Sequence, residues 1–118
     1  MERSKIRSVG MMSTHESPEA VNRLILEACV SARVRFYWKP NWTLLIDSDG
    51  IDSVLDRLGG AVEVLGFDTF TLEGKAVYAR LDYMTDFGEG IAPRAASAAI
   101  VDWPRDTGLW VEVVARRT

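Results

Sequence analysis

The chain has 118 residues, 47% of them hydrophobic and 26% charged, and a formal net charge of −3. This length and composition predict one folded domain and exclude a disordered chain. No apolar run reaches the ~18 residues that a membrane-spanning helix needs. The single cysteine, Cys29, can form neither an internal disulfide nor a cysteine-based zinc site. The hydrophobic core must therefore hold the fold, as is typical of a reducing, cytoplasmic compartment.

The charges divide the chain into two parts. Residues 1–16 are polar and lack the apolar stretch of a secretion signal, so we expect a mobile leader before a domain that spans residues 17–118. Residues 17–115 carry 15 acidic and 9 basic side chains, a balance of −6. Nucleic acid is an unfavourable partner for such a body, because phosphate binding requires clustered Lys and Arg. The acidity favours a basic protein partner, although it would serve solubility equally well.

A helix and a hairpin are predicted first. Residues 17–32 repeat apolar side chains at helical spacing, with Ser17 suited to the N-cap and Pro18 to the first helical position. Residues 33–39 and 42–47 alternate apolar and polar side chains around a Pro-Asn turn, which predicts an antiparallel hairpin.

A second helix and two more strands follow. Residues 51–58 predict a short helix, which a Gly-Gly pair ends. Residues 61–72 and 75–84 are two predicted strands joined by a tight Glu-Gly turn, and Gly66 indicates a bulge or bend in the first of them.

The C-terminal part predicts a loop, a helix and a strand. The acidic, glycine-rich residues 86–94 are expected to form a loop, residues 93–101 an alanine-rich helix and residues 109–116 the last strand. The order helix, strand, strand, helix, strand, strand, helix, strand predicts a single α+β domain. It should have about five strands in one antiparallel or mixed sheet and about three helices on one face.

No catalytic motif stands out. His15 lies in the expected leader, where a general base has neither a fixed position nor a partner, and Cys29 adjoins the apolar stripe of the first helix, as a buried structural thiol would. Residues 47–52 begin with the spacing of a calcium loop, but the glycine comes at the fourth position and Leu58 stands where that loop needs glutamate. We therefore predict no metal and no cofactor.

Two carboxylates near a strand end define an alternative site. Asp82 and Asp86 flank Tyr83, and Glu89 follows in the predicted loop. Paired carboxylates in a cleft can act as general acid and base. A small enzyme or ligand-binding domain that uses Asp82, Tyr83 and Asp86 is therefore one interpretation. A polar strand end without a function has the same composition.

Aromatic residues are the remaining signal. Strand alternation turns Tyr37 and Trp110 outward, and Trp42 lies at the same hairpin as Tyr37. Exposed Tyr, Trp and Arg are the residues that anchor protein interfaces. The residues expected to face the core on these strands are Val34, Phe36, Trp38, Leu109, Val111 and Val113.

These observations favour a protein-binding inhibitor, such as a bacterial immunity protein or antitoxin, that blocks a basic enzyme by occlusion. The predicted partner-binding residues are the anchors Tyr37, Trp42 and Trp110 and the acids Asp47, Asp49, Asp52, Asp82, Asp86 and Glu89. This patch assumes that the 47–52 turn and the 82–89 loop lie at one end of the sheet. A third interpretation is an oligomeric structural or regulatory module, such as a homodimer, that pairs through its last strand, because that apolar strand would be hazardous as a bare edge.

Overall fold

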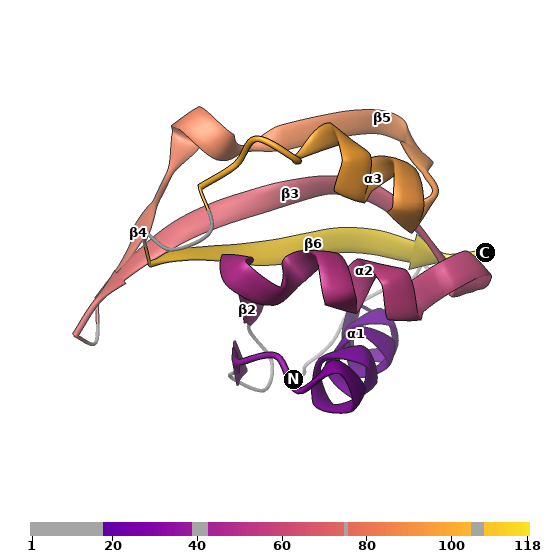
Figure 1. Ribbon diagram of the computed structural model, residues 1–118, viewed down its shortest axis with the longest axis horizontal. Coiled ribbons are helices and arrows are strands. Elements are labelled where there is room, and N and C mark those ends of the chain that lie inside the picture. Colours follow the sequence, from indigo (N-terminus) through magenta and orange to yellow (C-terminus); the bar gives the residue numbers. More distant parts are fainter. Residues whose placement is uncertain (1–17, 39–42, 75, 105–107) are drawn as a thin grey trace, which may run out of the picture.

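A computed structural model describes residues 18–38, 43–74, 76–104 and 108–118 of the chain (Figure 1). Within these ranges three α-helices and one six-stranded antiparallel sheet confirm the predicted α+β class. The helices are α1 (Pro18–Ala32), α2 (Ile51–Leu58) and α3 (Pro93–Ala99), and the 3-10 turns are η2 (Ser48–Gly50), η3 (Gly59–Ala61) and η4 (Leu81–Tyr83). The strands are β1 (Phe36–Trp38), β2 (Leu44–Asp47), β3 (Val62–Glu73), β4 (Ala76–Ala79), β5 (Thr85–Ile91) and β6 (Leu109–Arg117). None of the helices in these ranges has the length and apolar character needed to cross a membrane.

The sheet is organised around β3 and β6. Its order is β1-β2-β6-β3-β4, and β5 pairs with β3 on the edge that β3 also offers to β4. The last strand, β6, therefore lies between β2 and β3. Because both of its edges are paired, β6 does not offer the free edge for self-pairing that the sequence suggested.

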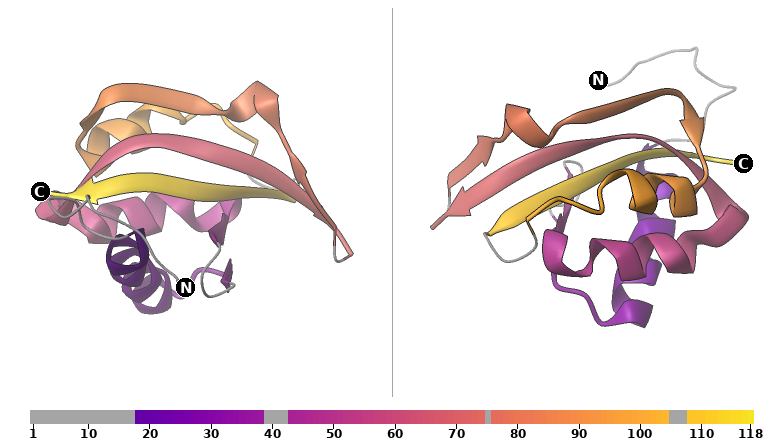
Figure 2. Two further views of the ribbon diagram at one scale, coloured as in Figure 1. Left: turned by 180° about the vertical axis from the view of Figure 1, so that it is seen from behind. Right: turned by 45° about the horizontal axis from the view of Figure 1, so that its top comes forward.

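The helices cover one face of this sheet. In Figure 1, α2 and α3 lie in front of the strands, and in the view from behind β5, β3 and β6 lie nearest the viewer (Figure 2, left). Ile25 of α1 and Leu55 of α2 share one buried cluster with Ile46, Phe67 and Val111 of the sheet. The apolar stripes of the helices thus pack on alternate residues of the strands, as the hydrophobic patterning predicts.

The end of α1 explains why β1 is shorter than predicted. The Arg33 N–H donates to the Val30 carbonyl (3.2 Å) and the Val34 N–H to the Cys29 carbonyl (3.0 Å). Arg33 has a φ of 59°, so the helix ends in a Schellman motif with a non-glycine residue in the left-handed position. The chain leaves this turn before it becomes extended, and β1 begins at Phe36. On this edge strand Phe36 is 38% exposed and only partly covered, although it was expected to face the core.

The prediction of a loop over residues 86–94 is wrong. Thr85–Ile91 form β5, which pairs with β3. Gly88 (φ 65°) and Gly90 (φ 107°) gave the segment its loop-like sequence, but the pairing partner, not local propensity, makes it a strand. Conversely, Leu81–Tyr83 form a 3-10 turn where the sequence predicted a strand. The predicted N-cap Ser17 and the turn at Pro40 lie outside the described residues.

Candidate functional site

The helix-free face of the sheet is the first candidate site. On β6, Leu109, Val111 and Val113 are buried toward the helices, whereas Trp110 and Glu112 are half-buried on the opposite face. This confirms the alternation predicted for the last strand. On β1, Tyr37 pairs with Leu45, which belongs to the same helix-free face because Leu44 and Ile46 enter the core cluster.

A bulge at Gly66 decides which residues of β3 reach this face. Before the bulge Val64 pairs with Ala115, and after it Gly66 pairs with Val114 and Asp68 with Glu112. The bulge inserts one extra residue and so reverses the alternation of β3, which turns Asp68 away from the core. The sequence predicted a bulge or bend at Gly66, and this is confirmed.

Trp110 and Phe70 form the aromatic part of the face. One row of paired residues crosses four strands as Asp47, Trp110, Phe70 and Ala79. Each neighbouring pair in such a row lies close enough for side-chain contact. Two rings at the centre of a paired sheet are held rigidly, so this row can present a fixed apolar surface.

Arg35 occupies one end of this row. Its Nε donates to Asp47 Oδ2 (2.8 Å), its Nη2 donates to the same oxygen, and its guanidinium lies 5.7 Å from the centre of the Trp110 ring. The second oxygen of Asp47 accepts from the Asp49 N–H (3.1 Å). Asp47 was predicted as one of the acids that contact a partner, and in the structure it forms an ion pair with Arg35. The sequence did not reveal this ion pair, because Arg35 and Asp47 are brought together only when β1 pairs with β2.

Asp68 and Glu112 form the acidic part of the face. They are directly paired across β3 and β6, and neither carboxylate has an ion pair among the described residues. Burial raises the pKa of Glu112 above its usual value, the Thr43 hydroxyl counteracts part of this shift, and the negative charge of Asp68 adds to it. Neither acid was predicted as a site residue, because the register that opposes them cannot be read from the sequence.

Thr43 lies close to Glu112, whose carboxyl its hydroxyl affects. It is 7% exposed, and its Oγ has no hydrogen-bond partner within ordinary distance and angle limits in the described part of the chain. Thr43 directly precedes β2, whose pairing with β6 joins Ile46 to Val111 and Asp47 to Trp110. Leu45 is fully buried. A buried hydroxyl without a partner is costly, so this position is under-satisfied in the isolated chain.

The predicted acids of the 82–89 segment do not join the Asp47 turn. Asp86 pairs with Gly66 on β5, so β6 and β3 lie between it and β2. Three strand spacings correspond to ~14 Å. Asp52, on α2, accepts from the Ser97 hydroxyl of α3 and therefore lies on the helix-covered side. The single acidic patch assumed from the sequence is thus divided, and Trp42 lies outside the described residues.

Asp82 and Asp86 also have separate partners. Arg80 donates to Asp82 through Nε (3.2 Å) and Nη2 (3.0 Å), which lowers the pKa of that carboxyl. The guanidinium of Arg80 also lies 5.3 Å from the centre of the Tyr83 ring. Asp86 Oδ1 accepts from the Gly88 N–H (2.7 Å), and the carbonyl of Glu89 accepts from Arg116 (2.5 Å). These contacts stabilise a turn and a strand. The lowered pKa keeps Asp82 ionised, so this carboxyl is not suited to act as a general acid.

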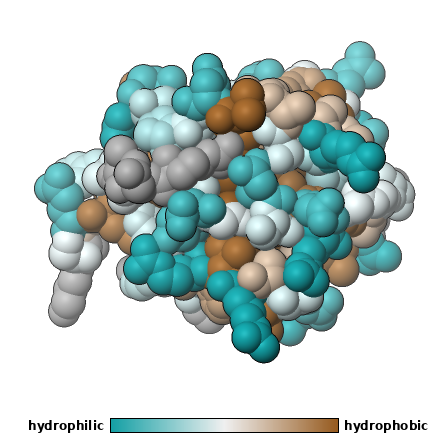
Figure 3. Space-filling model, in the orientation of Figure 1, coloured by the Kyte–Doolittle hydropathy of each residue, from teal (hydrophilic) through white to brown (hydrophobic). Residues whose placement is uncertain are grey.

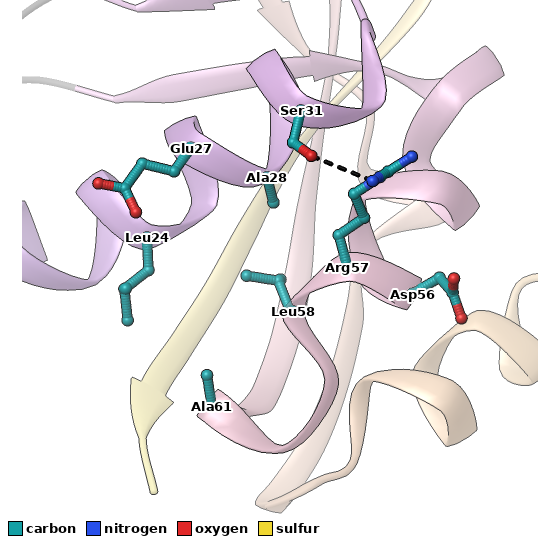
Figure 4. A pocket seen from close by; sticks show the side chains of 8 residues that line it. All are labelled: Leu24, Glu27, Ala28, Ser31, Asp56, Arg57, Leu58 and Ala61. Atoms are coloured by element: carbon teal, nitrogen blue, oxygen red, sulfur yellow. Dashed lines mark hydrogen bonds between the residues drawn. The ribbon is translucent and has the colours of Figure 1, made fainter.

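A groove of about 570 Å³ lies between α1 and α2 (Figure 4). Arg57 spans part of it and donates to the Ser31 hydroxyl (3.0 Å), while the carboxylates of Glu27 and Asp56 lie toward opposite ends. The lining residues are Leu24, Glu27, Ala28, Ser31, Asp56, Arg57, Leu58 and Ala61. This set contains no histidine or cysteine, and the hydroxyl of Ser31, its one side-chain hydroxyl, accepts from Arg57.

The described residues also offer little metal or thiol chemistry. Among them no three His, Cys, Asp or Glu side chains gather in a way that could hold a metal ion. Burial raises the pKa of the Cys29 thiol to about 12, so it stays protonated at neutral pH.

On the helix-covered side, hydrophobic residues form separate patches among hydrophilic ones (Figure 3).

Comparisons with known proteins add no assignment. No protein-family model matches the chain, and neither the curated proteins nor the solved structures that were searched include a match.

Proposed function

We propose that this chain is a protein-binding inhibitor of the immunity-protein or antitoxin type, which acts in the bacterial cytoplasm by occluding a basic enzyme. One observation carries the proposal. On the helix-free face the rings of Phe70 and Trp110 lie in the row next to Asp68 and Glu112, two acids that no described cation neutralises, and Tyr37 lies on the same face beyond β2.

The physical character of this face supports binding to a protein. Large aromatic side chains on a rigid surface bury much area at little entropic cost, and they dominate interface energies. Trp110 and Phe70 lie on strands that are paired on both edges, so the surface is preformed. Carboxylates around such anchors attract a basic partner and accelerate its approach, most strongly at low salt.

Occlusion needs no chemical step from this chain. The partner's active site would be covered by the aromatic row, with the unneutralised carboxylates facing its cations. The alternative enzyme site at Asp82, Tyr83 and Asp86 has less support, because Arg80 holds Asp82 in its ionised form and Asp86 caps a turn.

The test begins with the full chain as bait in a lysate of its source cell, at low and at moderate salt. Trp110→Ala should lower capture of a specific basic partner at least about tenfold, as expected for an interface anchor. Tyr78→Ala is the matched control, since Tyr78 is 53% exposed and its pairing with Thr71 places it on the other face. Thermal unfolding must show that both variants are folded.

The captured protein is then purified and its enzymatic activity is titrated with the chain. Stoichiometric inhibition that weakens in Trp110→Ala and persists in Tyr78→Ala would support the proposal. A partner whose activity is unchanged at saturation, or equal inhibition by both variants, would contradict it.

A further inference from the structure

We infer that Asp68 and Glu112, together with the Thr43 hydroxyl, form the receptor for one arginine side chain of the basic partner. This inference rests on the proposed function, because it assigns the chemistry by which the helix-free face recognises a protein. The inference also goes beyond the proposed function, since it names a site and a ligand group whose binding can be measured without the enzyme.

The arrangement of the two acids is the first argument. Residues directly opposed across antiparallel strands have Cβ atoms about 4.5–5.5 Å apart, and like charges there repel each other. Asp68 and Glu112 occupy such a pair on the face that the helices leave uncovered. A guanidinium placed between two carboxylates would relieve the repulsion and form several charge-assisted hydrogen bonds in one plane.

The second argument is the buried hydroxyl beside them. Thr43 is more than nine-tenths buried, and its Oγ has no hydrogen-bond partner within ordinary limits among the described residues, although it lies near enough to Glu112 to influence that carboxyl. Once a bound guanidinium fixes the position of the Glu112 carboxylate, the Thr43 hydroxyl can donate to it and help to hold its orientation. The orphaned donor is thus explained as part of a site that is completed on binding.

The third argument is that the same face already binds one guanidinium. Arg35 donates to Asp47 while its guanidinium lies over the Trp110 ring, in the row next to Glu112. Trp110 and Phe70 adjoin the Asp68–Glu112 row in turn, two residues along their strands. The Asp68–Glu112 row therefore lies next to the same two rings, and it offers two carboxylates without a described cation.

The test uses the full chain, labelled with ¹⁵N and ¹³C, and an oligo-arginine peptide as the probe. An oligo-citrulline peptide, which has the same shape without the charge, is the control ligand. Oligo-arginine should give saturable shifts that are largest at the carboxyl carbons of Asp68 and Glu112, and oligo-citrulline should give none. Glu112→Gln should weaken binding about tenfold or more, as expected for one charge-assisted hydrogen bond.

Asp86→Asn is the matched control, because it also removes one carboxylate, from β5, on the far side of β3. Equal weakening in Glu112→Gln and Asp86→Asn, or shifts centred on Asp86 and Glu89, would overturn the site and leave the proposed function intact. So would an inhibited enzyme whose affinity is unchanged by Glu112→Gln. Mapped binding of oligo-arginine together with the absence of any inhibited enzyme would instead retain the site and contradict the proposed function.

Discussion

Gly66→Ala should destabilise the fold by breaking the close approach of β3 and β5. A Cβ at this position would lie 2.4 Å from the carbonyl oxygen of Thr85, a backbone atom. Carbon–oxygen contacts between strands are normally about 3.3–3.6 Å, so the strands must separate by about 1 Å. Such overpacking costs about 1–3 kcal/mol, and the reduced entropy of the unfolded chain offsets about 0.4–1 kcal/mol of it.

Subtracting the midpoints of these ranges leaves an expected net loss of about 1.3 kcal/mol in the free energy of unfolding, or about 5 °C in Tm for a domain of this size. Urea denaturation measures the loss, and hydrogen exchange should show earlier opening of the amides of β5. Gly60→Ala is the control, because nothing lies within 4 Å of its added Cβ. If the two variants have equal stability, or if β5 exchanges no faster in Gly66→Ala, the steric argument is refuted.

Three further predictions concern single residues. Arg33→Gly should raise the free energy of unfolding by about 0.5–1 kcal/mol in denaturant titrations, since Arg33 has a left-handed φ of 59° that glycine adopts freely. Arg33→Ala, which keeps the Cβ, should not raise the free energy of unfolding. Cys29 should resist a thiol reagent at pH 8 until the chain unfolds, because its pKa is raised to about 12; rapid labelling of the native protein would contradict its burial. The raised pKa of Glu112 means that the folded state binds the carboxyl proton more tightly than the unfolded state does. Protonated Glu112 therefore stabilises the fold below pH 4.5, and this stabilisation is lost as the pH rises through the folded pKa. Glu112→Gln should therefore be more stable than the parent at neutral pH, with a gain that shrinks toward pH 4.5 in urea titrations, and a constant difference across this range would refute the assignment.

Several elements could be predicted from the sequence because local pattern determines them. The apolar stripe of residues 18–32 specifies α1, and the alternation in the last strand assigns Val111 to the core and Trp110 to the opposite face. Gly66 was predicted to mark a bulge or bend because glycine weakens the interior of a strand and often occurs there at such a feature. In each case the information lies within a few residues of the element.

The candidate site could be predicted only in part. Tyr37 and Trp110 were found from alternation, and both lie on the helix-free face. Phe70, Asp68 and Glu112 were missed as site residues, because they meet only through the pairing of β3 with β6 and through the reversal of alternation at the bulge. Asp47 was predicted as an acidic partner contact, and its ion pair with Arg35 was not foreseen.

The sequence by itself determined the α+β class and the direction in which most strand residues face, because hydrophobic period is a local property. The tertiary structure decided the strand order, the conversion of residues 85–91 from an expected loop to β5, and which charges are neighbours. These features depend on hydrogen bonds and charge pairs between segments far apart in the chain. Such pairs leave no periodic trace in either segment, so only the folded arrangement reveals them.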